Sequence, residues 1–215
     1  MKIIPAVKNS LKATPAYTLI SYYRKTMQIA DWRRSGCPVP PPHVLKQKIV
    51  SDYARRFGIN TLIETGTFMG DMIDATKQVF DQIYSIELSE SLFEKAKERF
   101  KNYRHIKLIQ GDSGEILPQL LEAITPPCLF WLDGHYSGGI TARGSQDTPV
   151  LQELSAIFEN SNNNHVVLID DARCFTGQDG YPTINTIKSL FKRHRSNCVF
   201  HVEHDIIQVF PLEWK

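Results

Sequence analysis

The chain has 215 residues, with 25 lysine and arginine residues against 23 aspartate and glutamate residues, and a formal net charge of +2. A charge so close to neutral gives no reason to expect nucleic acid or an anionic membrane as the main partner. Hydrophobic residues make up 42% and charged residues 22%, which is typical of a globular α/β domain with a full core. The sequence shows no apolar run near the roughly 20 residues of a spanning helix, and its start lacks the apolar core of a signal peptide.

The cysteines indicate a reducing compartment. Cys37, Cys128, Cys174 and Cys198 form no Cys-x-x-Cys pair, and Cys128 lies in an apolar run. We therefore expect buried free thiols and a cytoplasmic protein.

Residues 1–41 are expected to form a helical extension, and residues 42–215 the main domain. Tyr17, Ile20, Tyr23 and Met27 recur at roughly helical spacing before a proline run at 38–42. We interpret the extension as an arm that packs on the main domain or on a second copy in a homodimer. A lid over the substrate is the alternative.

Strands and helices then alternate along the main domain. The expected strands are Thr61–Ile63, Ile83–Ile86, Ile106–Ile109, Cys128–Leu132 and Val166–Ile169. The helix after the first strand is expected to run through Phe80, and a Ser91-x-x-Glu94 capping box to start the next helix. Two last apolar runs, 199–202 and 206–210, are too close for a crossover helix and predict an antiparallel hairpin. The fold class is α/β: a Rossmann-like, doubly wound sheet, mostly parallel, with helices on both faces.

Every expected parallel strand is closely followed by an acidic residue. These residues are Glu64, Glu87, Asp112, Asp133, and Asp170 with Asp171. Ligands of open α/β sheets bind at the carboxyl ends of the strands, so this edge is the predicted site.

The loop after the first strand predicts the ligand. It reads Glu64-x-Gly66-x-x-x-Gly70, and Glu87 follows Gly66 by 21 residues, the spacing of a carboxylate that accepts from ribose hydroxyls. An acid ahead of the glycines would repel a diphosphate and suit an ammonium group. Asp112 and Ser113 would lie beside the base. We infer an adenosine with a cationic amino-acid tail, which is S-adenosylmethionine.

The ordered segments ETGTFMG, SIELSE, GDS, LFWLDGHYSGG and VVLIDDAR resemble a class I S-adenosylmethionine-dependent methyltransferase over roughly residues 42–211. The closing hairpin resembles that family's sheet, whereas Phe68 replaces a glycine of the usual first loop. The resemblance implies that the cofactor contacts Glu64, Thr65, Gly66, Thr67, Gly70, Glu87, Asp112 and Ser113.

Within this class, the acids after the fourth and fifth strands resemble the metal-dependent O-methyltransferases of the catechol and macrolide-sugar types. The resemblance places Mg²⁺ on Asp133, Asp170 and Asp171, where carboxylate oxygens suit a hard cation and the cation relieves their mutual repulsion. Such an ion can lower the pKa of a substrate hydroxyl. In the alternative arrangement, Asp171 turns outward and Asp133 contacts only the cofactor.

Catalysis is assigned to Asp133 and His135. A histidine two residues past Asp133 is suited to act as general base, and a loop hydrogen bond or metal ligation is its alternative. The expected reaction is O-methylation of a hydroxylated small molecule, a sugar or a natural product. A nicotinamide-dependent oxidoreductase and a non-catalytic cofactor-binding protein are the other hypotheses.

Overall fold

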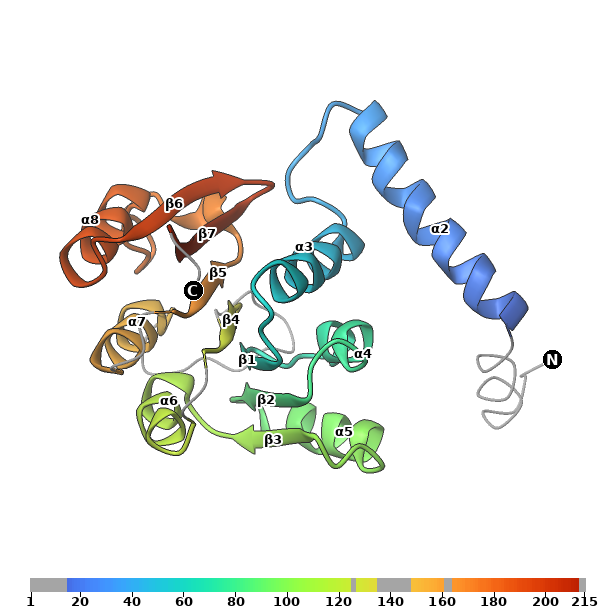
Figure 1. Cartoon of the computed structure of the whole chain (residues 1–215), viewed down its shortest axis with the longest axis horizontal. Helices are drawn as coiled ribbons and strands as arrows, with labels where there is room; N and C mark the ends of the chain where they lie inside the picture. Colours follow the sequence, from blue (N-terminus) through green and yellow to red (C-terminus); the bar gives the residue numbers. More distant parts are fainter. Residues whose placement is uncertain (1–14, 125–126, 135–147, 161–163, 213–215) are drawn as a thin grey trace. The chain divides into compact units, whose positions relative to one another are not determined.

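The computed structural model describes residues 15–124, 127–134, 148–160 and 164–212, without the side chains of residues 15–18 and 21. The chain divides into two compact units, Met1–Lys48 and Ile49–Lys215. Figure 1 shows that the second unit holds the sheet and the helices around it. No helix among the described residues is long and apolar enough to cross a membrane.

The N-terminal unit contains helix α2 (Pro15–Arg34) and the start of α3 (His43–Arg56). Helix α2 lies within residues 1–41, for which the sequence predicts a helical extension; that division of the chain stays a prediction. After α2 the chain is held by Trp32, whose indole N–H donates to the carbonyl of Pro38 over 2.7 Å. Leu19, Tyr22 and Tyr23 are exposed on α2. The homodimer arm and the lid both stay predictions.

The sheet has seven strands in the order β3-β2-β1-β4-β5-β7-β6. The strands are β1 (Thr61–Thr65), β2 (Gln82–Glu87), β3 (Ile106–Gln110), β4 (Leu129–Leu132), β5 (Val166–Ile169), β6 (Cys198–Glu203) and β7 (Ile206–Pro211). The first five are parallel, and β7 pairs antiparallel with both β5 and β6. The predicted parallel sheet with a terminal antiparallel hairpin is confirmed.

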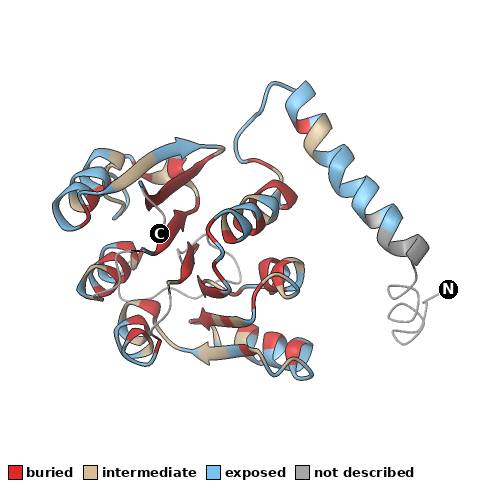
Figure 2. Ribbon diagram, in the orientation of Figure 1, coloured by how far each residue is buried: buried red, intermediate tan, exposed pale blue. Residues whose placement is uncertain are grey.

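The central strands are buried on both faces, as parallel strands with helices on either side require. In β4, Phe130 and Leu132 join a core with helices α6, α7 and α8, whereas Leu129 and Trp131 join a core with α3, α4 and α5. Figure 2 shows the strands at the centre of this unit as buried and the outer sides of the helices as exposed. The central strands are therefore packed by helices on both faces of the sheet.

The remaining helices are α4 (Asp71–Thr76), α5 (Glu90–Phe100), α6 (Ser113–Glu122), α7 (Val150–Glu159), the 3₁₀ turn η1 (Ala172–Cys174) and α8 (Ile184–His194). Two sequence expectations were wrong here. Helix α4 ends at Thr76, whose hydroxyl donates back to the carbonyl of Met72, and does not reach Phe80. Helix α5 is capped by Ser89 without a side-chain bond, which puts Ser91 inside the helix and rules out the capping box.

The four cysteines are free. Cys128 is buried, as expected, but Cys37 is exposed and contradicts the expectation of buried thiols. Cys37 follows the end of α2 with a φ of +57°, in a turn that has no core around it.

Candidate functional site

The ends of β1, β4 and β5 are joined in register by backbone hydrogen bonds. The Asp133 N–H donates to the Thr65 carbonyl over 3.1 Å, and the Asp170 N–H donates to the Leu132 carbonyl over 3.0 Å. Three of the predicted acids, Glu64, Asp133 and Asp170, therefore lie at one edge of the sheet.

Glu64 lies inside β1, which continues two residues beyond the predicted end. Its side chain is only 2% exposed. The Ser85 hydroxyl donates to Glu64 Oε2 over 2.5 Å, and the Thr67 hydroxyl lies 2.6 Å from that of Ser85. Burial raises the pKa of Glu64 to about 8, the Ser85 bond opposes this shift, and the nearby Asp133 and Glu87 carboxylates add to it. Within the described residues Ser85 is the one hydrogen-bond partner of this carboxyl group, and it binds Oε2 alone.

The loop after β1 passes very close to the loop after β4. Gly66 has a φ of +82°, and a Cβ atom placed on it would lie 2.5 Å from the carbonyl oxygen of Asp133. Gly70, at the start of α4, has a φ of +76°. Only glycine satisfies the conformation and the contact at Gly66 together. The glycine spacing thus brings two strand-end loops together.

Glu87 ends β2 and organises the same loop. Its Oε2 accepts from the Phe68 N–H over 2.8 Å and its Oε1 accepts from the Ser89 N–H over 2.9 Å. Phe68 takes a left-handed φ of +49°, which a bulky residue rarely adopts and which is typical of functional loops. A carboxylate accepts about four hydrogen bonds, so Glu87 retains capacity for ribose hydroxyls.

Asp112 and Ser113 begin α6 with their side chains already engaged. Asp112 caps the helix by accepting from the Gly114 N–H over 2.9 Å. The Ser113 hydroxyl donates to Glu153 Oε1 over 2.6 Å in a buried bond. Sequence reasoning missed Glu153, although it stands in the apolar stripe of α7 formed by Val150, Leu154 and Ile157, where a carboxylate is unusual.

The metal site predicted on Asp133, Asp170 and Asp171 stays a prediction. Among the described residues, no group of three or more His, Cys, Asp or Glu side chains is arranged to hold a metal ion. Asp171 has a φ of +54°, and its Oδ1 accepts from Arg173 Nη1 over 2.7 Å. The same nitrogen donates to Asp205 Oδ2, and the Arg173 N–H donates to Asp205 Oδ1 over 2.8 Å. A guanidinium thus provides the positive charge beside Asp171.

The Arg173 guanidinium is balanced by two carboxylates. Burial lowers its pKa, but its hydrogen bonds and charge interactions with Asp171 and Asp205 prevail and raise it. Asp205 is a second residue that sequence reasoning missed. Asp205 lies in the β6–β7 turn, 32 residues from Arg173, so no local sequence pattern links the two residues.

His135, the predicted base, lies outside the described residues. It follows Gly134, where a Cβ atom would lie 3.1 Å from Thr65 Oγ1 and 3.2 Å from Glu153 Oε1. The chain therefore enters the His135 segment from the edge of the sheet that carries Glu64 and Asp133.

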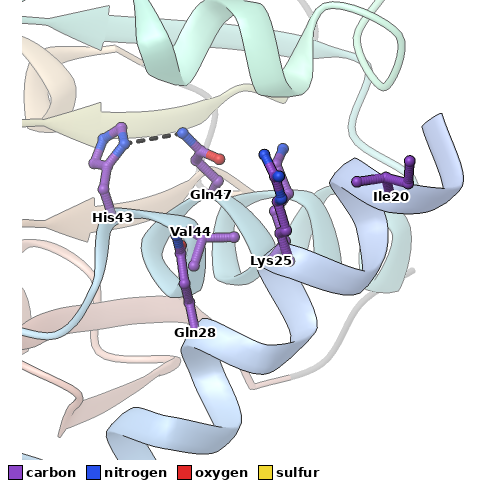
Figure 3. A pocket seen from close by; sticks show the side chains of 7 residues that line it. Ile20, Lys25, Gln28, His43, Val44 and Gln47 are labelled. Carbon is purple, nitrogen blue, oxygen red and sulfur yellow. Dashed lines mark hydrogen bonds between the residues drawn. The ribbon is translucent and has the colours of Figure 1, made fainter. Parts of the chain in front are cut away.

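A cavity of about 330 Å³ lies within the N-terminal unit, between α2 and the first turns of α3 (Figure 3). It is lined by Ile20, Arg24, Lys25, Gln28, His43, Val44 and Gln47. His43 Nδ1 and Gln47 Nε2 form a hydrogen bond of 2.9 Å across its wall (Figure 3). None of the residues predicted for the cofactor, the metal or catalysis lines this cavity.

No protein-family model and no curated protein matches the chain. Solved structures do. The O-methyltransferase TomG from Streptomyces achromogenes, involved in tomaymycin synthesis and solved with S-adenosylmethionine, is 16% identical over 87% of this chain and 88% of its own, with a TM-score of 0.58. A putative rRNA methylase from Clostridium thermocellum is 14% identical over 75% and 94%, with a TM-score of 0.52. MycE from the mycinamycin pathway, in complex with Mg, S-adenosylhomocysteine and mycinamycin VI, is 20% identical over 74% and 48%, with a TM-score of 0.51.

The chain has a methyltransferase fold. At identities of 14 to 20% the likeness establishes the architecture, and it confirms the fold that the ordered motifs predicted. One neighbour is a putative rRNA methylase and another is solved with mycinamycin VI, so the fold leaves the acceptor open.

Proposed function

We propose that the chain is an S-adenosylmethionine-dependent methyltransferase that acts on a hydroxyl group of a small molecule. The observation that carries this proposal is the Glu64 carboxylate, buried beside Gly66, with one oxygen held by Ser85. A carboxylate with a raised pKa suits a cationic amino group, which would stabilise its ionised form. The fold and the cofactors bound in TomG and MycE support the same assignment.

Each residue of the site has a proposed role. Glu64 binds the ammonium group, and the backbone of Thr65, Gly66, Thr67 and Gly70 follows the amino-acid tail. Glu87 accepts from the ribose hydroxyls, and Asp112 lies beside the base, with Ser113 fixed behind it. The bound cofactor supplies the methyl group to the acceptor oxygen.

The chemistry on the enzyme side is positioning and proton removal. Holding donor and acceptor in line provides much of the acceleration of a displacement reaction. We propose Asp133 as the residue that orients the acceptor and His135 as the base that takes its hydroxyl proton. No step is assigned to a metal ion, because Asp171 is paired with Arg173. MycE was solved with Mg bound, so the predicted magnesium dependence of this chain is tested independently of these roles.

Calorimetric titration of the purified protein tests the proposal. S-adenosylmethionine and S-adenosylhomocysteine should bind at micromolar concentrations, and NAD⁺ at equal concentration should not. Failure to bind either sulfur compound would overturn the cofactor assignment, and binding of NAD⁺ alone would favour the oxidoreductase. Methyl transfer that persists in the presence of a chelator would rule out a required metal ion.

A screen of hydroxylated acceptors with radiolabelled methyl donor then tests the reaction. His135→Ala should lose methyl transfer and keep cofactor binding, whereas a non-catalytic binding protein would show no transfer in either form. Size-exclusion chromatography with light scattering tests the homodimer that we propose for the residue 1–41 arm. A monomer at micromolar concentration would remove that role.

A further inference from the structure

Glu153 is a carboxylate in the core. It is 1% exposed and lies on the face of α7 that carries Val150, Leu154 and Ile157, all of them buried. Burying a carboxylate is unfavourable unless hydrogen bonds compensate for the lost water. An apolar residue at this position would pack without that penalty, so packing alone does not account for a glutamate here.

The carboxylate of Glu153 lies where three strand-end loops meet. Its Oε1 accepts from the Ser113 hydroxyl over 2.6 Å, which ties α7 to the loop after β3. The same oxygen lies close to Gly134 in the loop after β4, where a Cβ atom would be 3.2 Å away. The same Cβ atom would lie 3.1 Å from Oγ1 of Thr65, at the end of β1. Glu153 is thus close to residues that follow or end three strands of the sheet.

This arrangement repeats the one around Glu64. There a serine of a neighbouring strand, Ser85, donates to a buried carboxylate, and here Ser113 does so. Both hydrogen bonds are short, 2.5 Å at Glu64 and 2.6 Å at Glu153, and hydrogen bonds are directional, so they fix the segments that they join. One buried carboxylate faces the cofactor loop, and the other lies behind the loops after β3 and β4.

We propose that Glu153 is a positioning residue for the cofactor site, which holds the Asp112–Ser113 loop and the Asp133–Gly134 loop at a fixed separation. This inference rests on the proposed function for its effect on cofactor binding. Ser113 then acts through Glu153 and does not itself bind the base. The base of the cofactor meets a loop that is ordered before binding, which reduces the entropy lost on binding.

Hydrogen exchange in the cofactor-free protein tests the positioning directly. In Ser113→Ala and Glu153→Ala, the amides of residues 113–116 and 133–134 should exchange at least tenfold faster than in the wild type. Glu159→Gln, at the exposed end of the same helix, is the matched control and should leave them unchanged. Unchanged exchange in both folded site variants would overturn the proposal, whatever the protein binds.

Titration with S-adenosylhomocysteine tests the functional consequence. Glu153→Ala and Ser113→Ala should each weaken binding about tenfold, and the double variant should be no weaker than Glu153→Ala, because both remove one interaction. KM for the cofactor should rise with kcat nearly unchanged. Glu153→Gln, which retains the acceptor oxygen, should recover part of the affinity. Additive losses would overturn the inference, whereas a wild type that binds no S-adenosylhomocysteine would overturn the proposed function alone.

Discussion

The Glu87 carboxylate at the end of β2 accepts the backbone N–H of Phe68 in the loop after β1, over 2.8 Å. One side chain therefore shapes the loop and is also the proposed ribose acceptor. Glu87→Gln should weaken S-adenosylhomocysteine binding roughly 10- to 100-fold, because a charge-assisted bond becomes a neutral one. Calorimetry measures this loss, with the exposed Glu90→Gln as the control. If the wild type and Glu87→Gln bind S-adenosylhomocysteine equally well, Glu87 does not accept from the ribose hydroxyls.

The close approach at Gly66 predicts a large loss of stability for Gly66→Ala. A left-handed backbone alone costs an alanine about 1 kcal/mol. The contact with the Asp133 carbonyl should add roughly 2 kcal/mol of strain. Gly58→Ala is the matched control, because Gly58 has a φ of +56° and nothing lies within 4 Å of its added Cβ. Urea unfolding of the cofactor-free proteins gives the difference, and equal losses would contradict the contact.

Glu64 predicts that stability falls as the pH rises. Its pKa in the folded protein, about 8, exceeds its ordinary value of 4.5, so its neutral form is favoured by folding. The resulting contribution is present in full below pH 4.5 and is lost as the pH rises through 8. The free energy of unfolding of the wild type, relative to Glu64→Gln, should decline across this window by on the order of a few kcal/mol. If the free energies of unfolding of the two proteins change with pH in the same way, the pKa of Glu64 is not raised.

Cofactor binding should release a proton from Glu64. At pH 7 the carboxyl group is mostly neutral in the free protein, and an ammonium group beside it would favour ionisation. Titrations of S-adenosylhomocysteine in phosphate and in Tris, which differ in ionisation enthalpy, should show the release of up to about one proton. Glu64→Gln should show none. A wild type that binds without proton release would place the ammonium group elsewhere.

Arg173→Met should destabilise the protein and test the metal site. It leaves Asp205, whose side chain is 2% exposed, without its guanidinium partner. We expect a loss of about 2 kcal/mol, less than for a fully buried pair because Arg173 is itself 38% exposed. If these carboxylates accept a divalent cation, millimolar Mg²⁺ should raise the Tm of Arg173→Met and leave Arg193→Met unchanged. If Mg²⁺ leaves the Tm of both variants unchanged, no cation binds at this end of β5.

Local patterns predicted the frame of the site. Apolar runs followed by acids indicated the strands of the parallel sheet, and the distance from Gly66 to Glu87 placed both residues in one loop cluster. These features succeed because each depends on residues close together in the chain.

The contacts between distant segments were not predictable in this way. The place of Ser113 beside the base stays a prediction, whereas its hydrogen bond to Glu153, 40 residues later, was not foreseen. The place of Asp171 on a metal ion stays a prediction, whereas its hydrogen bond with Arg173, which also binds Asp205 across the β6–β7 turn, was not foreseen. A carboxylate takes whichever donor the tertiary fold brings near, and no spacing rule specifies that donor.

The position of β7 has a consequence for how the protein is made. All six of its residues are buried, and it lies between β5 and β6, so a strand translated late fills an interior place in the sheet. Until residue 211 is synthesised, the nascent chain has an apolar β5 edge with no neighbour, the kind of edge that invites aggregation. A ribosome that stalls near residue 205 would therefore leave a product with a complete cofactor loop and an open sheet.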